Sequence, residues 1–300
     1  MKHLFIVNPV AGGSDKTEFV RDAARRVFGD DFEIYVTKAP MDAADEIKRR
    51  AAGGEELWIY ACGGDGTFNE CCCGAAGLDN VSLCPFPTGT GNDFCRMFGS
   101  DAEKYRDLAA IARGHIHPID LIDCNGRYSV NICSAGIDAR IGTNVHKYST
   151  LPLVGGATAY VISSVVEMFK GISRRVKVSA EGFYADGPHT LICACNGRYY
   201  GGGFNPSVDA MPDDGIMDVL VTKKVSLPVF AALIGKYAAG RATELKKYVT
   251  HLRVKELTLE FDGEDVLNID GEAMYAQKVT MRIAPHALRL IVPDGMTFFD

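Results

Sequence analysis

The chain has 300 residues, of which 47% are hydrophobic and 23% are charged, a composition typical of soluble globular proteins with a sizeable core. The length favours two domains. The formal net charge of −6 argues against broad attraction to nucleic acid or to anionic membranes, but it leaves room for a local basic patch. Candidates are residues 48–50 and 174–175, although most such runs are solvated helix faces.

The first part of the chain alternates between apolar runs and helical patterns. In chain order, the pattern predicts a strand at 3–9, a helix at 16–28, a strand at 32–37, a helix at 41–52, and strands at 57–62 and 81–87. Strands that alternate with helices form βαβ units around a mainly parallel sheet. Ligands of such sheets bind at the carboxyl ends of the strands, where NPVAGG, GGDGT and PTGTGND all fall.

These three segments are glycine-rich loops, and glycine lets backbone N–H groups approach an anion closely. A helix that begins at the end of such a loop adds its own amides and dipole. The alternative, a hairpin turn at Asp65-Gly66, is disfavoured because FNECCCGAA, which follows, lacks strand alternation. The sequence therefore predicts a polyphosphate site. Neither GxxxxGK[ST] nor GxGxxG is present, which argues against a P-loop protein and a Rossmann dehydrogenase.

After about residue 117 the pattern changes to short strands separated by turn signals. We expect strands at 176–180, 190–196, 217–222, 257–261, 266–269, 279–283 and 288–292, and helices at 157–169 and 226–240. This pattern is typical of an antiparallel β-sandwich. The fold class is therefore α/β with two domains, 1–117 and 118–292, and the tail at 293–300 is expected to return to the first domain.

Ten cysteines raise the question of a disulfide framework or a zinc site. No CxxC pair occurs, and the consecutive Cys71, Cys72 and Cys73 cannot converge on one tetrahedral metal. The apolar run at the N-terminus is too short for a signal peptide. We therefore expect reduced thiols that pack as small hydrophobes in a cytoplasmic protein.

The segment from Tyr148 to Val166 carries no charged residue, which raises the question of a membrane-spanning helix. Pro152, Gly155 and Gly156 interrupt it, so a loop followed by a buried helix is the preferred interpretation. We also expect this segment to form the lipid-facing surface of a protein that contacts bilayers transiently.

Six motifs in a fixed order, NPVAGG, GGDGTFNE, PTGTGNDFCR, NGRYYGGGF, PDDGIMD and IDGE, resemble the diacylglycerol kinase catalytic-domain family of lipid kinases. That family includes the bacterial soluble diacylglycerol kinases and the sphingosine kinases. The resemblance spans nearly the whole chain. GGDGT also occurs in the related NAD kinases, and PTGTGNDF favours the lipid kinases.

The resemblance implies a nucleotide-binding domain of the kind shared by NAD kinases and diacylglycerol kinases, a β-sandwich domain for the lipid substrate, and ATP between them. The residues that it assigns to ATP are Asn8, Pro9, Val10, Ala11, Gly12, Thr37, Gly63, Gly64, Asp65, Gly66, Thr67, Phe68, Asn69, Glu70, Thr88, Gly89, Thr90 and Asn92.

The resemblance also implies a catalytic set of carboxylates. Asp65 and Asp93 would organise Mg²⁺ and water, whereas turn or N-cap roles are the alternative. Asp270 of the DGE match would be the general base and Glu272 a metal or water partner, although either of the two could abstract the proton. We expect Asp270→Asn to leave folding nearly untouched, and Asp262→Asn, in the other Asp-Gly pair, to be the inert control.

In PDDGIMD the resemblance implies a structural Mg²⁺ site made by the Asp214 carboxylate with the backbone carbonyls of Met211 and Ile216. A plain turn is the alternative. The proline usual before this stretch is displaced to Pro206, which puts the geometry of that site in question.

The sequence-based prediction is thus an ATP- and Mg²⁺-dependent lipid kinase, with diacylglycerol as the first candidate acceptor and phosphatidic acid as the product. The alternatives are a kinase for a sphingoid base, phosphatidylglycerol or NAD, and a catalytically silent nucleotide-binding regulator. The expected partner is a membrane lipid, met through transient peripheral contact from the cytoplasm. No nucleic acid is expected, and homodimer formation is left open.

Overall fold

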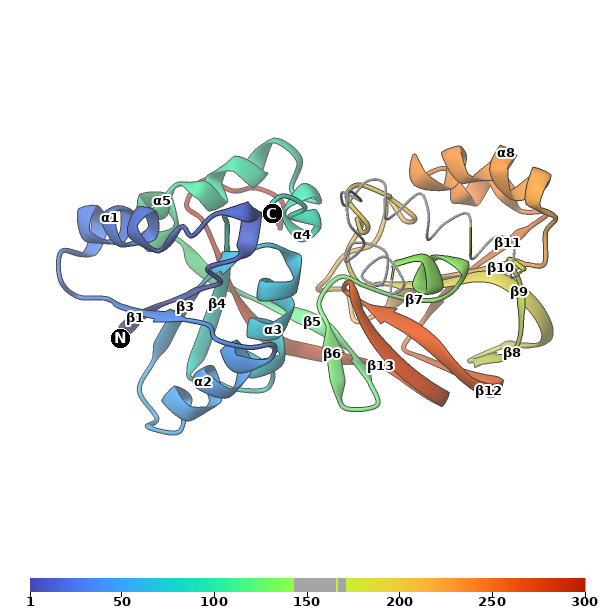
Figure 1. Ribbon diagram of the computed structural model, residues 1–300, viewed down its shortest axis with the longest axis horizontal. Helices are drawn as coiled ribbons and strands as arrows, with labels where there is room; N and C mark the ends of the chain where they lie inside the picture. The colour runs from blue at the N-terminus through green and yellow to red at the C-terminus, as the bar shows by residue number, and fades with distance from the viewer. Residues whose placement is uncertain (143–165, 167–170, 300) are drawn as a thin grey trace. The chain divides into compact units, whose positions relative to one another are not determined.

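The computed structural model describes residues 1–142, 166 and 171–299, which form two compact units. Unit 1 is Met1–Leu121 with Ala284–Asp300, and unit 2 is Ile122–Ile283 (Figure 1). The division expected at 117/118 lies at 121/122, and the chain returns to unit 1 at 284 rather than at 293. The reason is that β5 (His115–Cys124) and β13 (Glu272–Val292) are long strands that contain the boundaries, so no turn marks them.

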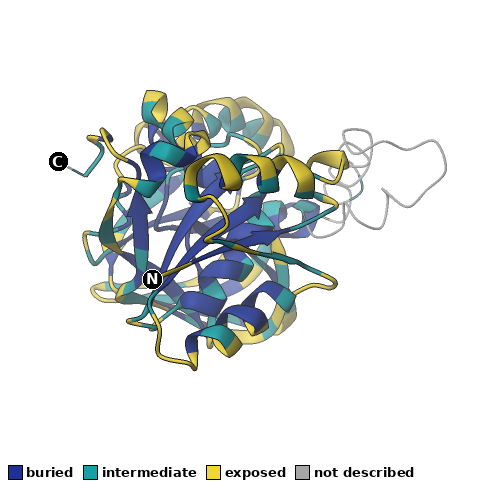
Figure 2. Ribbon diagram, turned by 90° about the vertical axis from the view of Figure 1, so that its left-hand side faces the viewer, coloured by how far each residue is buried: buried dark blue, intermediate teal, exposed yellow. Residues whose placement is uncertain are grey.

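Unit 1 is built on a sheet in which neighbouring strands are parallel, in the order β2-β1-β3-β4-β13. Its strands before β5 are β1 (Lys2–Val7), β2 (Glu33–Val36), β3 (Leu57–Gly63) and β4 (Val81–Pro87). All seven residues of β3 are buried, as expected for a central parallel strand with helices on both faces. Figure 2 shows these strands buried beneath helices whose outer faces are exposed.

The helices of unit 1 are α1 (Thr17–Phe28), α2 (Asp42–Ala51), α3 (Asp65–Ala75), α4 (Asp93–Arg96) and α5 (Leu108–Ala112), with 3-10 turns at Ala11–Gly13 (η1) and Gly99–Arg106 (η2). In Figure 1, α1 and α5 lie on one face of the sheet, and α2 and α3 lie on the other. In α1, Val20 and Ala24 are buried one turn apart, and the helix ends at Gly29, whose φ is 63°.

Unit 2 is an antiparallel β structure. Its strands are the end of β5, then β6 (Arg127–Ser129), β7 (Ile132–Gly136), β8 (Arg174–Ala180), β9 (Phe183–Cys195), β10 (Met217–Lys223), β11 (Val249–Val254), β12 (Glu256–Ile269) and most of β13. Both β7 and β8 pair with β9 and with β12, so the sheet closes on itself around a core that includes Ile192, Val219 and Leu267. Helix α8 (Leu227–Ala238) and the 3-10 turn η3 (Ala242–Leu245) connect β10 to β11.

Two strand boundaries predicted from the sequence are wrong. The strands expected at 257–261 and 266–269 are one strand, β12, whose register shifts between Glu260 and Asp265. Asp262-Gly263 therefore lies in a bulge and not in a turn, because a bulge can bend a strand without ending it. Likewise, the runs at 279–283 and 288–292 belong to the single strand β13, which continues past Pro285 and His286.

All ten cysteines are free thiols, and nine of them are buried. Burial raises the pKa of Cys62 and Cys71, so these thiols stay protonated and unreactive. The expectation that the cysteines pack as small hydrophobes is confirmed. Among the described residues, no helix combines the length and apolar character needed to span a membrane; the segment from Tyr148 to Val166 lies outside the described residues except for Val166.

Candidate nucleotide site and catalytic carboxylates

Three glycine loops meet at the carboxyl end of the unit 1 sheet. The amides of Thr88 and Gly89 both donate to the Gly63 carbonyl, at 3.0 and 2.9 Å. A Cβ on Gly89 would lie 2.6 Å from the Cα of Gly64, and a Cβ on Gly12 would lie 2.7 Å from the Thr88 carbonyl oxygen. Only glycine permits backbones to approach this closely, so the three loops form one surface that consists largely of main chain.

Helix α3 begins within this surface. Gly64 precedes its first residue, and the first intrahelical bond runs from Phe68 N–H to the Gly64 carbonyl at 3.1 Å. The amides of residues 65–67 lie in the first turn, where the helix supplies them with no partner. Asp65 and Gly66 thus form the start of a helix rather than an open loop, and the helix dipole favours an anion here.

Asn8 ties the first loop to this helix. Its amide Nδ2 donates to Thr67 Oγ1 at 3.1 Å, and its Oδ1 accepts the Val10 N–H at 3.1 Å. The side chains of Thr67, Phe68 and Asn69 are buried, and the Phe68 ring lies 4.7 Å from that of Phe94. These three predicted ligand residues therefore hold α3 in place through their side chains.

The other residues assigned to the nucleotide lie around the rim of the same surface. Val10 and Thr90 are exposed, whereas Pro9, Ala11, Gly66, Glu70 and Asn92 are partly exposed. Asn92 has a positive φ of 53° and donates from Nδ2 to the Gly89 carbonyl at 2.9 Å, which shapes the third loop.

Asp65 reaches from α3 to the start of α4. Its Oδ1 accepts the Phe94 N–H at 3.3 Å, and the amides of Asn92 and Asp93 also bond to this carboxylate. Burial raises the pKa of Asp65, and these amides oppose the shift because they stabilise the charged form. A Cβ on Gly91 would lie 2.5 Å from Asp65 Oδ2. The prediction did not include Gly91, although the second glycine of TGTGND was a visible signal.

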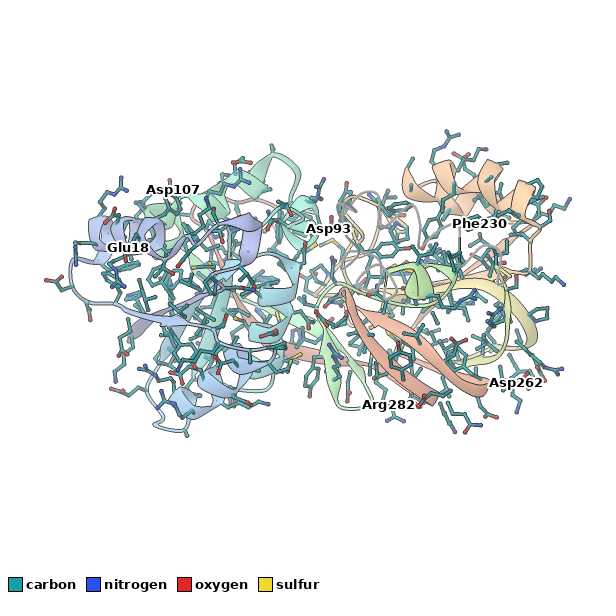
Figure 3. All side chains as sticks on the ribbon, in the orientation of Figure 1. Glu18, Asp93, Asp107, Phe230, Asp262 and Arg282 are labelled. Atoms are coloured by element: carbon teal, nitrogen blue, oxygen red, sulfur yellow. The ribbon has the colours of Figure 1, made fainter. Side chains whose placement is uncertain are left out.

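Asp93 is the first residue of α4 and is 5% exposed (Figure 3). Its Oδ1 lies 3.1 Å from Arg96 Nε, which also donates to the Gly91 carbonyl at 3.2 Å. Asp65 and Asp93 therefore lie close together in the same unit, joined through the start of α4. Arg96 was not among the predicted site residues, although it ends the motif PTGTGNDFCR.

Thr37 follows β2, and its amide donates to the Val7 carbonyl at 2.9 Å, beside the first loop. Asp42 of α2 holds this strand end, because its carboxylate accepts the Tyr35 hydroxyl at 2.9 Å and the Lys38 N–H at 2.8 Å.

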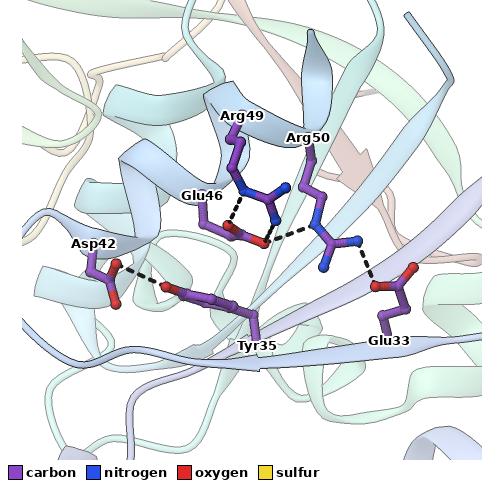
Figure 4. A network of polar contacts seen from close by, with 6 residues as sticks. All are labelled: Glu33, Tyr35, Asp42, Glu46, Arg49 and Arg50. Carbon is purple, nitrogen blue, oxygen red and sulfur yellow. Dashed lines mark hydrogen bonds and ion pairs between the residues drawn. The ribbon is translucent and has the colours of Figure 1, made fainter. Parts of the chain in front are cut away.

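Figure 4 shows the neighbouring network, in which Glu46 binds Arg49 and Arg50, and Arg50 also binds Glu33. Two of the three residues of the basic run at 48–50, Arg49 and Arg50, are thus paired with acidic neighbours.

In unit 2, Asp270 and Gly271 form a two-residue hairpin turn between β12 and β13. Ile269 pairs with Glu272, and the φ angles of Asp270 and Gly271 are 50° and 98°, as in a type I′ turn. The Asp270 carboxylate accepts four neighbouring donors: Ser129 Oγ at 2.8 Å and the amides of Val130, Asn131 and Ile132 at 2.7, 3.2 and 2.8 Å.

These contacts correct one expectation. Asp270→Asn would turn an NH₂ group toward amides that are themselves donors, so the substitution cannot leave folding untouched. Asp262, labelled in Figure 3, lies eight residues earlier in the exposed bulge of β12. Glu272 is exposed at the first residue of β13.

The structural Mg²⁺ site at Asp214 stays a prediction, and arginine side chains lie around its loop. The Asp214 carboxylate accepts the Ile216 N–H at 3.1 Å, and Arg253 Nη2 lies 2.5 Å from its other oxygen. On the neighbouring segment, Arg198 donates to the Ala210 carbonyl at 2.9 Å and contacts the Met211 sulfur at 3.0 Å. Two guanidinium groups therefore flank the loop where a divalent cation was expected, and the turn interpretation accounts for Asp214.

The sequence also missed Asp138, which lies just after β7. Its carboxylate accepts the Tyr200 hydroxyl at 3.0 Å and the Ala139 N–H at 2.7 Å, and Tyr200 Oη lies 3.4 Å from Tyr237 Oη. Burial raises the pKa of Asp138 to about 6. No spacing rule in the sequence connects these residues, because three separate segments supply them.

A parallel α/β unit with converging glycine loops, in one chain with an antiparallel β unit, defines the class of two-domain kinases with an α/β domain and a β-sandwich domain. The chain belongs to the diacylglycerol kinase catalytic-domain family. Residues 2–124 match the diacylglycerol kinase catalytic domain, and residues 131–292 match the YegS C-terminal NAD kinase beta sandwich-like domain.

Individual proteins agree with this assignment. A "Probable lipid kinase YegS-like" of Pseudomonas aeruginosa strain PAO1 is 30% identical over 91% of this chain and 88% of its own length. A protein of the same name from Stenotrophomonas maltophilia is 28% identical over 97% and 96%. A solved diacylglycerol kinase from Bacillus anthracis superposes with a TM-score of 0.71 at 24% identity, covering 99% of this chain and 98% of that one, and supports the fold.

Proposed function

We propose that this protein is an ATP- and Mg²⁺-dependent lipid kinase that transfers the γ-phosphate to a lipid hydroxyl, with diacylglycerol as acceptor and phosphatidic acid as product. Membership of the lipid-kinase family supports the class of reaction. The choice of diacylglycerol is supported by the name of another solved B. anthracis relative, a "putative diacylglycerol kinase" that is 26% identical to this chain.

The observation that carries the proposal is the meeting of Gly12, Gly64 and Gly89 at the start of α3. A main-chain surface at a helix N-terminus binds phosphate groups through amides, without a P-loop lysine. In the proposed complex the first turn of α3 holds the phosphates, and the rim residues Val10 and Thr90 contact the rest of the nucleotide.

The donor chemistry of Asp65 and Asp93 suits magnesium, since both are carboxylates beside the proposed phosphate site. When bound, Mg²⁺ would neutralise charge on the phosphate oxygens. Asp65 also holds the start of α4 and thereby positions Asp93. The substitution of either carboxylate should weaken the metal dependence of nucleotide binding.

For the acceptor proton we assign Glu272 as the base and Asp270 as a positioning residue. Both oxygens of Asp270 already accept donors from residues 129–132, whereas Glu272 lies exposed two residues further on. Asp270 shapes the turn from which Glu272 projects. Loss of a general base typically lowers the rate by a factor of about 10² to 10⁴.

The test is a panel of lipids incubated with ATP labelled on the γ-phosphate, in which diacylglycerol should give labelled phosphatidic acid. The Glu272→Gln variant should bind ATP normally and melt at the wild-type temperature, yet lose turnover. Labelling of a sphingoid base, phosphatidylglycerol or NAD instead of diacylglycerol would reject the proposed acceptor. ATP binding without labelling of any acceptor would favour the regulator.

A further inference from the structure

Helix α8 is apolar on both of its faces although it lies at the surface of unit 2. Among its twelve residues only Lys236 is charged. One face is partly or fully buried: Val229 and Phe230 pack against the cluster of Ile137, Ile141, Ile172 and Val225, and Tyr237 belongs to a second core cluster. Figure 3 labels Phe230 on this helix.

The opposite face carries no charge over its first two turns. Leu227 is 44% exposed, and Pro228, Ala231, Ala232 and Gly235 are exposed as well. Surface helices of soluble proteins normally place charged residues on this face. An exposed apolar face bordered by polar residues is typical of a surface that contacts another molecule or a membrane.

Four exposed lysines gather where α8 begins. Lys223 and Lys224 precede the helix, and Lys246 and Lys247 follow η3. The Lys223 amide donates to the Tyr248 carbonyl at 2.9 Å, and Thr222 pairs with Val249, so the two lysine pairs come together beside the start of α8. We call Lys223, Lys224, Lys246, Lys247 and the exposed residues Leu227, Pro228 and Ala231 the α8 surface.

The charge of this region contrasts with the rest of the chain. From residue 223 to 247 there are six basic residues and one acidic residue, in a protein whose net charge is −6. The acidic residue, Glu244, is engaged by Arg241 at 2.6 Å and lies 3.4 Å from Lys236. Within the described part of the chain, no ion pair engages the four lysines of the α8 surface.

The other basic runs differ, since acidic side chains pair with Arg49 and Arg50 and with Arg175. At the α8 surface the arrangement costs stability, because like charges lie side by side near the positive end of a helix dipole. The first turn of α8 contains no acidic residue to offset this. An anionic partner would relieve the repulsion.

We propose that the α8 surface docks unit 2 onto an anionic lipid bilayer. The lysines bind the layer of negatively charged headgroups, and Leu227, Pro228 and Ala231 contact its apolar boundary. The inference deepens the proposed function, on which it rests, by naming where a lipid kinase meets the bilayer that contains its acceptor. The contact is mainly electrostatic and therefore weakens as salt rises.

The test is sedimentation of the nucleotide-free protein with vesicles, either of phosphatidylcholine alone or of phosphatidylcholine mixed with phosphatidylglycerol. Wild type should sediment with the mixed vesicles only, and less at high salt. The quadruple variant Lys223→Gln, Lys224→Gln, Lys246→Gln, Lys247→Gln should bind about two orders of magnitude more weakly. Leu227→Asn should reduce binding by a factor of about five.

The matched control removes the same charge elsewhere, at the exposed residues Lys38, Lys48, Lys255 and Lys278, and should bind within about twofold of wild type. Unchanged binding by the α8 quadruple variant, or an equal loss in the control, would overturn the proposal. Because vesicle binding is measured without turnover, its result tests the docking proposal even if the kinase assay shows no phosphorylation. Conversely, turnover of a water-soluble short-chain diacylglycerol by the α8 quadruple variant should equal that of wild type.

Discussion

Asp65 in unit 1 and Asp270 in unit 2 precede a glycine in the same dipeptide, and each binds three consecutive amides of a distant segment. Asp65 accepts the amides of residues 92–94, and Asp270 accepts those of residues 130–132. Yet Asp65-Gly66 opens a helix, whereas Asp270-Gly271 closes a hairpin with both residues at positive φ. Each carboxylate fixes a loop beside a proposed catalytic group, Asp93 in one unit and Glu272 in the other.

The comparison teaches that a dipeptide with strong turn propensity does not determine its own backbone. The strand before Asp65 is central and parallel, so the chain must cross over through a helix. The strand before Asp270 pairs directly with the strand that follows, so a two-residue turn suffices. At Asp270 the glycine that follows, with a φ of 98°, permits the tight turn, whereas Gly66 follows Asp65 inside helix α3.

The largest effect is expected from removing the hydrogen bonds by which the Asp270 carboxylate, in the hairpin turn, binds residues 129–132. Asp270→Asn should destabilise the protein by about 2–4 kcal/mol, since buried amides lose an ionised acceptor and face an NH₂ group. Its rate should fall by a factor of about 10² or more, because the displaced turn carries Glu272. Urea unfolding and steady-state kinetics measure the two effects. Asp262→Asn, in the exposed bulge, should change stability by less than about 0.5 kcal/mol.

If Asp262→Asn lowered the stability as much as Asp270→Asn, the two Asp-Gly pairs would not differ in their structural importance, contrary to the prediction. If Asp270→Asn folded normally and lost only turnover, the general-base role implied by the family resemblance would be right, and our positioning role would be wrong.

The next largest effect concerns the helix that Asp65-Gly66 opens. Gly66→Val places a branched side chain in the first turn of α3 and should weaken ATP binding by at least about 100-fold. Stability should hardly change, because valine is no worse than glycine within a helix. Isothermal titration and thermal melting check this. Gly53→Val, whose Cβ would meet one atom, Arg50 O at 3.5 Å, is the control, and equal affinity of both variants would refute the main-chain phosphate site.

Removing the hydrogen bonds between the Asp65 carboxylate and the amides of residues 92–94 should have an intermediate effect. Asp65→Ala leaves the amides of residues 92–94 without their acceptor and should cost about 1–3 kcal/mol. Hydrogen exchange should accelerate at residues 92–96 and remain unchanged at residues 129–132. Equal acceleration at both segments would mean that the hydrogen bonds of Asp65 and those of Asp270 are not independent.

Asp138 extends the comparison of Asp65 with Asp270 to a third buried carboxylate. Burial raises the pKa of Asp138 and of Asp65, but fewer backbone amides counteract this rise at Asp138 than at Asp65. Its folded pKa of about 6 exceeds the value of 3.8 for an unperturbed aspartate, so the folded state is penalised as the carboxyl ionises. The contribution of Asp138 to stability should therefore fall as the pH rises from about 4 to 6 and stay low above that. Asp138→Asn should remove this part of the pH dependence in urea unfolding; an unchanged profile would contradict the shift.

The smallest effect is expected at Asp214-Gly215, where Arg253 forms an ion pair with the Asp214 carboxylate. Without nucleotide, EDTA and Mg²⁺ should leave the melting temperature of wild type unchanged. Arg253→Met should cost up to about 1 kcal/mol, because the pair is partly exposed to solvent. Stabilisation of wild type by Mg²⁺ that Asp214→Asn abolishes would show that the loop holds a metal after all.

Sequence alone determined the alternation of strands and helices in unit 1, because burial on both faces and helical periodicity are local patterns. It also placed the glycine loops together, since parallel strands bring their carboxyl ends to one edge. For the same local reason it could not show that β12 continues through Asp262-Gly263, because a bulge and a turn have the same composition.

Only the tertiary structure decided what the carboxylates do. Asp65, Asp138 and Asp270 each bind at least one partner from a distant segment (29 residues away for Phe94, 62 for Tyr200 and 140 for Val130), and no spacing rule encodes such contacts. The same holds for Arg253 at Asp214, which lies 39 residues away. The residue types could thus be identified as chemically capable from the sequence, whereas burial and hydrogen-bond partners, which set their roles, exist only once the chain has folded.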